Sequence, residues 1–549
     1  MVARPQSETA RRMHALTLAS VAVATLLGAL ARLAHVFAVD FPLNDGGLFC
    51  TMTQDLLASR LAWPWYTSYN GLRLPFVYPP LPFYFAAVVS LLTKAPPVDV
   101  LRLLPALFSI LTIPAVYLLS WWVLRSRTQS LYATIAYALL PRSFLWLIMG
   151  GGLTRAPGLL FAILTLYCAL EMFTKRLRRT VLWVILFGGL TVLCHPEAAW
   201  FTSFSAVLLW VLYGRDRETL KLSLAAGAGV LLVTAPWWGV AISRHGVSTL
   251  LAAFATGGQN WLAWFPLLTL SFAEETFVDL LTTIGLLGAF LSLARRKWFL
   301  PAWAVLIVLL DPRSAGTYAV IPLAMLAGLA LDSMILPAID KAAAAAACAR
   351  LPASDAIRPE SDQPPGGAPG FISRIMLGAL LFYALFSALS VRLVRSRVLD
   401  VLSPDDREAM AWVRQSTPPD ARFLVITAPI VWSADCVSEW FPTLTERVSV
   451  ATVQGHEWMP DSGFRKQLTR YVGLQECAAS DARCVENWAR LHAAQDAYVY
   501  VKVRQTRTES GVTRPVLMAV RESLAASQSY RLVYDGPGAT VFESLLGVY

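Results

Sequence analysis

An aspartate lies on a glycine-flanked turn directly after the first apolar stretch of the chain. Asp45 follows Asp40-Phe-Pro-Leu-Asn and precedes Gly46-Gly47. A carboxylate beside a lipid boundary can take the proton of a hydroxyl or amide group while that group attacks an activated carbon atom. Aspartate also caps helix N-termini frequently, which is the competing interpretation. Asp45 is therefore the candidate catalytic residue, with helix capping as the alternative.

Three arginines are candidates for binding a phosphate group. Arg155 ends the run Gly150-Gly-Gly-Leu-Thr, whose glycines let backbone amides approach an anion, and its guanidinium offers planar donors. Arg32 lies inside the first apolar stretch, where a charge is costly and usually meets a ligand or a buried partner. Arg313 follows Asp311-Pro. The alternatives are a tight turn for the Gly-rich run, extension of Arg32 to lipid headgroups, and a solvated helix cap at Arg313.

Further polar and aromatic residues are expected to line a cavity beside these groups. His195-Pro-Glu197 interrupts an apolar stretch from 180 to 213. Polar residues at that depth favour a water-filled cavity, and a histidine packed against a neighbouring helix is the alternative. The other predicted cavity residues are Tyr78, Glu274, Trp432, Asp435, Glu457 and Trp458.

The composition places these residues in a membrane protein. The 549 residues are 56% hydrophobic and only 15% charged, and the mean hydropathy is positive. Such values exceed what a soluble domain needs. The net charge of +10 agrees with basic loops near anionic lipid and requires no nucleic acid partner.

Eleven apolar stretches are predicted to cross the hydrocarbon core, which is roughly 30 Å thick. The predicted spans are 14 to 38, 103 to 124, 128 to 148, 157 to 173, 180 to 194, 198 to 213, 221 to 242, 277 to 294, 298 to 310, 317 to 337 and 375 to 396.

The basic loops between these spans predict the orientation, because short loops rich in Lys and Arg stay in the cytoplasm. All the basic clusters fall on one side only if the apolar stretch 80 to 93 does not cross, so this stretch is predicted to be a juxtamembrane helix. The N-terminus is then cytoplasmic, and the first outer loop, residues 39 to 79, is extracytoplasmic. The clusters are Arg11-Arg12, Arg125 with Arg127, Lys175 to Arg179, Arg215 to Lys221, and Arg295 to Lys297.

Two segments differ in composition from the rest. Residues 341 to 373 hold an alanine run followed by Pro, Gly, Ser and Asp, which predicts a disordered cytoplasmic linker. Residues 398 to 549 lose the long apolar runs and alternate helical with strand-like stretches. The expected fold is a polytopic α-helical membrane domain, residues 1 to 397, followed by an extracytoplasmic soluble α/β domain, residues 398 to 549.

The layout resembles the GT-C superfamily of integral-membrane glycosyltransferases, which take a sugar from a polyprenyl phosphate or pyrophosphate on the non-cytoplasmic face. Protein O-mannosyltransferases and aminoarabinose transferases of this superfamily place an acidic residue in a long first outer loop with juxtamembrane helices. Asp45 occupies that position, and Tyr78-Pro-Pro-Leu-Pro-Phe-Tyr84 is similar to the segment that often follows it.

A second similarity is to the catalytic subunit of oligosaccharyltransferases. Ser271-Phe-Ala-Glu274 resembles their Ser-Val-Ser-Glu-like motif, and Trp432-Ser-Ala-Asp435 partly resembles the Trp-Trp-Asp-Tyr-Gly signature. Their second outer loop carries paired acids that help hold a divalent metal, whereas Gly150 to Arg155 contains no carboxylate. A hard cation needs several oxygen ligands, so no metal and no other cofactor is predicted.

The resemblance implies inverting transfer of a sugar from a polyprenyl-phosphate-linked donor to a protein, glycan or lipid acceptor at the outer face of a plasma membrane. Asp45 would take the acceptor proton, and one or more of Arg32, Arg155 and Arg313 would bind the phosphate. The alternatives are oligosaccharyltransferase-like transfer of a lipid-linked glycan to protein, and a non-catalytic carrier or flippase for such glycans. Polar residues collected at one face, without paired halves in the sequence, favour the enzyme over the carrier.

Overall fold

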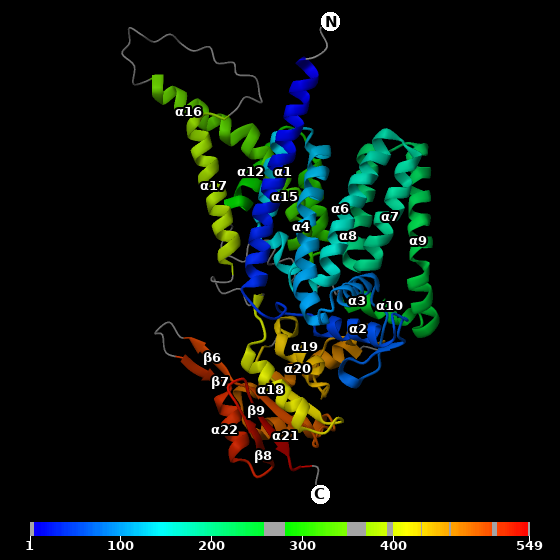
Figure 1. Ribbon diagram of the computed structural model, residues 1–549, viewed down its shortest axis with the longest axis vertical. Helices are drawn as coiled ribbons and strands as arrows, with labels where there is room; N and C mark the ends of the chain where they lie inside the picture. Colours follow the sequence, from blue (N-terminus) through cyan, green and yellow to red (C-terminus); the bar gives the residue numbers. More distant parts are fainter. Residues whose placement is uncertain are drawn as a thin grey trace.

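The computed structural model describes residues 5–256, 280–348, 369–391, 399–429, 431–460, 463–507 and 513–546. A helical bundle forms one end of the molecule, and a layer of strands and helices forms the other (Figure 1). The predicted cavity residue Glu274 and most of the predicted linker, residues 349–368, lie outside the described residues.

The bundle helices follow the apolar stretches of the sequence. They are α1 (Pro5–Phe37), α4 (Pro97–Leu124), α5 (Arg127–Leu139), α6 (Gly152–Lys175), α7 (Arg178–Cys194), α8 (Pro196–Tyr213), α9 (Arg217–His245), α10 (Val247–Thr256), α12 (Leu280–Ala294), α13 (Phe299–Leu310), α14 (Ala315–Tyr318), α15 (Val320–Ala330), the π-helix Leu331–Ile335, α16 (Leu336–Cys348) and α17 (Phe371–Ser390).

Within the described part of the chain, six helical segments are long and apolar enough to cross a membrane. The number of eleven spans stays a prediction, because several bundle helices, α12 and α13 among them, are shorter. The six segments are Arg11–Phe37, Pro97–Leu124, Gly152–Lys175, Arg217–His245, Ala315–Ala347 and Phe371–Ser390.

Two sequence-based boundaries are wrong. The span predicted over 128 to 148 ends early, since α5 stops at Leu139 and two 3-10 turns, Pro141–Ser143 and Leu145–Leu147, follow. Proline disfavours the helical conformation of the residue before it, which explains the break. The linker predicted from residue 341 is helical at its start, because α16 continues to Cys348 through the alanine run, and alanine has the highest helix propensity.

The basic clusters gather at one end of the bundle. Arg176, at the end of α6, pairs with Asp216, which caps α9. Arg125 stacks on Trp122, and the Trp122 ring contacts Tyr213 at the end of α8. Tyr213 in turn contacts Phe299 at the start of α13, directly after the basic cluster at 295 to 297. The loops that carry the candidate site residues therefore lie at the opposite end.

Helix α3 (Leu81–Thr93), which the sequence predicts to be juxtamembrane, has both its ends at the site end of the bundle. Tyr78, just before α3, contacts His195. Arg102, in the first turns of α4, donates a hydrogen bond to the carbonyl of Val36 near the end of α1. The stretch 80 to 93 therefore does not pass from one end of the bundle to the other. The same loop region holds α2 (Gly47–Ala58) and a two-stranded ribbon, β1 (Tyr66–Thr67) with β2 (Leu74–Pro75).

Residues 399 to 546 fold around a five-stranded sheet of order β4-β3-β5-β9-β8. Strands β4, β3 and β5 run parallel, and β9 pairs antiparallel with β5 and β8. A separate antiparallel pair, β6 with β7, projects beside it (Figure 1). The elements are α18 (Pro404–Ser416), β3 (Arg422–Ile426), α19 (Cys436–Thr445), β4 (Val448–Ser449), the 3-10 helix η8 (His456–Trp458), α20 (Gly463–Glu476), α21 (Ala482–Leu491), β5 (Tyr498–Lys502), β6 (Arg504–Arg507), β7 (Thr513–Val516), α22 (Met518–Ala526), β8 (Tyr530–Asp535) and β9 (Ala539–Ser544).

One apolar core joins this sheet layer to the first loop. Phe41, Phe76 and Phe83 from the loop region belong to the same buried cluster as Trp440 and Phe441 of α19. Phe41 packs edge-on against Trp440, with 4.7 Å between ring centroids. Because burial of large aromatic side chains is strongly favourable, this core holds α19 directly against the turn that carries Asp45.

Candidate active site

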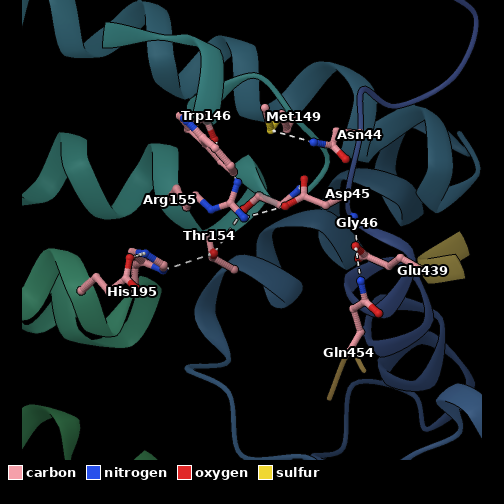
Figure 2. A network of polar contacts seen from close by, with 12 residues as sticks. Asn44, Asp45, Gly46, Trp146, Met149, Thr154, Arg155, His195, Glu439 and Gln454 are labelled. Carbon is pink, nitrogen blue, oxygen red and sulfur yellow. Dashed lines mark hydrogen bonds and ion pairs between the residues drawn. The ribbon is translucent and has the colours of Figure 1, made fainter. Parts of the chain in front are cut away.

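An ion pair between the first and second loops forms the centre of the site. Arg155 Nη2 donates a hydrogen bond of 2.5 Å to Asp45 Oδ2, and the Gly151 amide donates one of 2.7 Å to Asp45 Oδ1. Figure 2 shows this ion pair, and both of its side chains are partly buried. The site therefore brings together the predicted catalytic aspartate and one of the predicted phosphate-binding arginines.

The glycines of the two loops permit this contact. Gly46 adopts a φ of +121°, a conformation that side chains with a Cβ rarely take. A Cβ on Gly151 would lie 2.4 Å from Asp45 Oδ2 and 2.8 Å from Arg155 Nη2, inside the ion pair itself. A Cβ on Gly150 would lie 2.0 Å from the Asp45 carbonyl oxygen. The Gly-rich run thus serves close approach of two backbones as well as donation of an amide.

The Arg155 side chain is also fixed from the bundle side. Its Nη1 donates to the Trp146 carbonyl at 3.2 Å, and its guanidinium lies 5.4 Å from the Trp146 ring centroid. An arginine fixed by a carbonyl, a ring and a carboxylate is pre-oriented and keeps further N–H donors, and a guanidinium suits a phosphate group.

Helix α19 contributes a buried acid that the sequence did not indicate. Glu439 Oε1 accepts a hydrogen bond of 2.9 Å from the Gly46 amide, and Gln454 Nε2 donates to Oε2 at 3.3 Å (Figure 2). Burial, and next the charge of Asp45, raise the pKa of Glu439 from its usual 4.5 to about 8. Glu439 thus contacts Gly46, the residue that follows the catalytic candidate Asp45, although 393 residues separate Glu439 from Gly46 in the sequence.

A second polar group lies beside the ion pair, around Tyr78 and His195. The Tyr78 hydroxyl lies 3.0 Å from His195 Nδ1 and 3.3 Å from Thr154 Oγ1, and Thr154 directly precedes Arg155. The Trp458 ring packs edge-on against Tyr78, with 5.4 Å between centroids. Burial raises the pKa of Tyr78 well above its usual value, although Arg155 and Arg313 both oppose that shift.

The predicted Glu197 and Arg313 complete this group. His195 Nε2 lies 3.5 Å from Glu197 Oε2, and Arg313 Nε lies 3.5 Å from Glu197 Oε1. Ser314 donates to Glu197 at 2.5 Å. Arg313 is half exposed, so it can turn toward a ligand.

Two further acids lie near Arg313. Burial, and next the charge of Glu197, raise the pKa of Asp311 to about 7. Within the described part of the chain, the buried Oδ2 of Asp311 has no hydrogen-bond partner. Burial also raises the pKa of the predicted Glu457 on η8, and the charge of Arg313 opposes this. The predicted cavity residues Tyr78, His195, Glu197, Glu457 and Trp458 therefore lie in one connected region with Arg313.

The structure does not bring Arg32 to this region, which corrects one phosphate-binding prediction. Its guanidinium is fully buried and donates to Ser109 Oγ at 2.9 Å, to the Ala138 carbonyl at 2.8 Å and to Ser143 Oγ at 3.3 Å. These neighbours on α4, α5 and the turn after α5 satisfy the charge inside the bundle. Arg32 therefore meets buried partners inside the protein, which is the alternative to a ligand for a charge in an apolar stretch.

Two other predicted cavity residues lie elsewhere. Asp435 caps the N-terminus of α19 by accepting the Ser438 amide, and it also accepts hydrogen bonds from Thr427 and Tyr471. Trp432 packs edge-on against Phe464. The partial signature at 432 to 435 therefore shapes the start of α19, and the contacts of that helix with the active-site turn come from later residues, Glu439 among them.

The prediction of no metal is not tested by these contacts. Within the ranges that the structure describes, no cluster of three or more His, Cys, Asp or Glu side chains has a geometry for holding a metal ion.

A family model described as dolichyl-phosphate-mannose-protein mannosyltransferase matches residues 77–239 of this chain. Among solved structures, the oligosaccharyltransferase AglB from Archaeoglobus fulgidus, in complex with an inhibitory peptide and a dolichol-phosphate, is similar with a TM-score of 0.54 at 13% identity, covering 91% of this chain and 74% of AglB. This chain has the GT-C fold. The superfamily resemblance drawn from the sequence is confirmed.

Two more GT-C structures are similar over most of this chain. Apo ArnT from Cupriavidus metallidurans matches with a TM-score of 0.51 at 16% identity, covering 97% of this chain and 98% of ArnT. The arabinofuranosyltransferase AftD from Mycobacteria matches with a TM-score of 0.55 at 15% identity, covering 96% of this chain and 40% of AftD. No curated protein matches the sequence significantly. The family-model match includes Tyr78, Arg155 and His195 but begins after Asp45, so the assignment of Asp45 depends on the geometry of this GT-C site.

Proposed function

We propose that this chain is a glycosyltransferase that moves a sugar from a polyprenyl-phosphate-linked donor to an acceptor at the outer face of a plasma membrane. The observation that supports this proposal most strongly is the contact of Asp45 with Arg155 and the Gly151 amide. This contact lies at the end of the bundle opposite the basic clusters. A base and an anion-binding cation side by side are what transfer from a phosphate leaving group requires.

Asp45 is the proposed base. Its two oxygens each accept one hydrogen bond from the protein, which leaves lone pairs for the acceptor hydroxyl or amide. The acceptor oxygen or nitrogen attacks the anomeric carbon while its proton passes to Asp45, and the carbon–oxygen bond to the phosphate breaks with its electron pair going to the phosphate. A single displacement of this kind inverts the anomeric configuration.

Arg155 and Arg313 are the proposed phosphate-binding residues. Arg155 is oriented by Trp146 and Asp45, and Arg313 is held more loosely by Glu197. Fixed positive charge is most effective where negative charge develops, and here this is the leaving phosphate. Tyr78 and His195 lie between the two arginines along the network of contacts, so they would face the donor sugar or its phosphate.

The test uses the purified full chain in lipid nanodiscs with a panel of radiolabelled polyprenyl-phosphate sugars. We expect release of free polyprenyl phosphate that depends on an added acceptor. In sealed vesicles, movement of the intact labelled lipid across the bilayer without cleavage would instead support a carrier and overturn the proposal. Transfer that requires a pyrophosphate-linked oligosaccharide and an asparagine-containing peptide would support the oligosaccharyltransferase alternative.

A further inference from the structure

The backbone of the active-site turn is held on its far side by one short helix. Trp440 Nε1 donates to the Asn44 carbonyl at 2.9 Å, and Thr443 Oγ1 donates to the Gly47 carbonyl at 2.8 Å. Glu439 Oε1 accepts a hydrogen bond of 2.9 Å from the amide of Gly46, which lies between Asn44 and Gly47 in the turn. Residues on both sides of Asp45 thus bond to α19, while the Asp45 side chain bonds to the second loop.

The contact between α19 and the turn leaves no space for adjustment. A Cβ on Gly47 would lie 2.6 Å from the Glu439 carbonyl oxygen and 3.1 Å from the Trp440 Cα. The Tyr69 hydroxyl donates to that same Glu439 carbonyl at 2.7 Å. Helix α19 is therefore held by the turn and by Tyr69 together.

Among these contacts, the Glu439 side chain has the most demanding environment. It is only 7% exposed, and its two oxygens are taken by the Gly46 amide and by Gln454. Four titratable or charged groups act on Glu439. They are Asp45 and Tyr69 of the first loop, Arg155 of the second loop, and Glu457 of the C-terminal segment. A buried acid beside a second acid is costly, and such costs are retained where they serve a function.

We infer that Glu439 is a positioning residue of the active site, which fixes the Gly46 amide and thereby the direction of the Asp45 carboxylate. This inference rests on the proposed function of Asp45. It assigns the C-terminal segment a part in setting the catalytic geometry. Length matters more than charge in this role, because the Gly46 hydrogen bond needs an oxygen at the end of a side chain with two methylenes.

Two substitutions separate side-chain length from the ionisable group. Glu439→Gln keeps the reach and an oxygen acceptor but removes the ionisable carboxyl group, and Gln454 can rotate its amide to match it. Glu439→Asp keeps a carboxyl group but is one methylene shorter, so its oxygen withdraws from the Gly46 amide. Glu446→Asp is the matched control, because Glu446 ends the same helix in an exposed pair with Arg414.

The measurements are steady-state transfer kinetics and hydrogen exchange of the peptide that contains Gly46. We expect Glu439→Asp to lower kcat by about 10- to 100-fold, with KM for the donor within about threefold, because small misplacements of a catalytic group are that costly. In Glu439→Asp we also expect the Gly46 amide to exchange its hydrogen faster than in the unmodified protein. Glu439→Gln retains kcat within about threefold, as expected from a retained acceptor, and Glu446→Asp matches the unmodified protein in both measurements.

Three results would overturn the inference. One is unchanged exchange at Gly46 in Glu439→Asp, another is faster exchange with unchanged kcat, and the third is a larger loss in Glu439→Gln than in Glu439→Asp. Absence of transfer by the unmodified protein would count against the proposed function instead. The exchange measurement would still test the anchoring of Gly46 in that case.

Discussion

Asp45 and Arg155 lie 110 residues apart in the sequence and 2.5 Å apart in the fold, measured from Oδ2 to Nη2. The acid and the cation therefore act as one unit. Arg155→Lys keeps the charge but loses the planar fork that reaches Asp45 and Trp146 together. We expect transfer to fall by about 10- to 100-fold, measured as release of polyprenyl phosphate.

The matched control for Arg155→Lys is Arg407→Lys. Arg407 forms an ion pair of the same 2.5 Å length with Asp40 at the edge of the same loop, but the Asp40 side chain is 66% exposed. Exposed pairs contribute little, so transfer should stay near that of the unmodified protein. Equal losses in the two variants would show that an arginine at either position is equally important for transfer, and that the site pair has no special part in the rate.

Gly151→Ala should separate the ion pair without removing either charged group. The added methyl would enter the space between Asp45 Oδ2 and Arg155 Nη2. We expect a loss of transfer of about 100-fold, in line with the cost of displacing a catalytic group. Gly378→Ala on α17 is the control, because a Cβ there meets no atom within 4 Å, and full activity is expected. Normal transfer by Gly151→Ala would show that the pair is not needed for catalysis.

Arg32→Lys should affect stability and not donor binding. A lysine cannot supply the separate hydrogen bonds that Arg32 makes to Ser109, Ala138 and Ser143. Each buried acceptor left unsatisfied costs roughly 1 to 3 kcal/mol, so the melting temperature should fall clearly. KM for the donor in the folded protein should stay unchanged. A raised KM with an unchanged melting temperature would restore Arg32 as a phosphate-binding residue.

The pH dependence of stability should carry a contribution from Glu439. Its pKa rises from 4.5 to about 8 on folding, so the folded chain binds this proton more tightly than the unfolded chain. The resulting stabilisation is fully present below about pH 4.5 and is lost as the pH rises toward 8. The melting temperature of the unmodified protein should therefore fall more between pH 5 and pH 8.5 than that of Glu439→Gln.

Glu446→Gln provides the comparison for the pH experiment, because Glu446 is exposed and should leave the pH dependence unaltered. Parallel melting curves for the unmodified protein and Glu439→Gln across this range would mean that Glu439 keeps an ordinary pKa in the folded protein.

Much of the site was predictable from the sequence, because its members lie in loops whose composition contrasts with the spans. Asp45, Arg155 and His195 each interrupt or follow a long apolar stretch. Alternation of loops between the two membrane faces then places them at one end of the bundle. This argument assigns an end but no contacts, so the 2.5 Å pair between Asp45 and Arg155 emerged only from the fold.

The failures have a common physical reason. Arg32 was expected to bind phosphate because its buried partners, Ser109 and Ser143, are neutral hydroxyls that leave no mark in a hydrophobic pattern. Glu439 could not be predicted because it belongs to no recognisable motif, and its partner Gly46 is 393 residues away. The partial signature ends at Asp435, one helical turn earlier, and that residue caps α19.

The most direct test of the account is transfer by Asp45→Asn. The amide is isosteric with the carboxylate, and its one oxygen can still accept a hydrogen bond from Gly151 or Arg155, but it cannot take a proton from the acceptor. We predict no measurable release of polyprenyl phosphate above background, with a melting temperature and donor binding close to those of the unmodified protein. Turnover at the unmodified rate would contradict the assignment of Asp45 as the base.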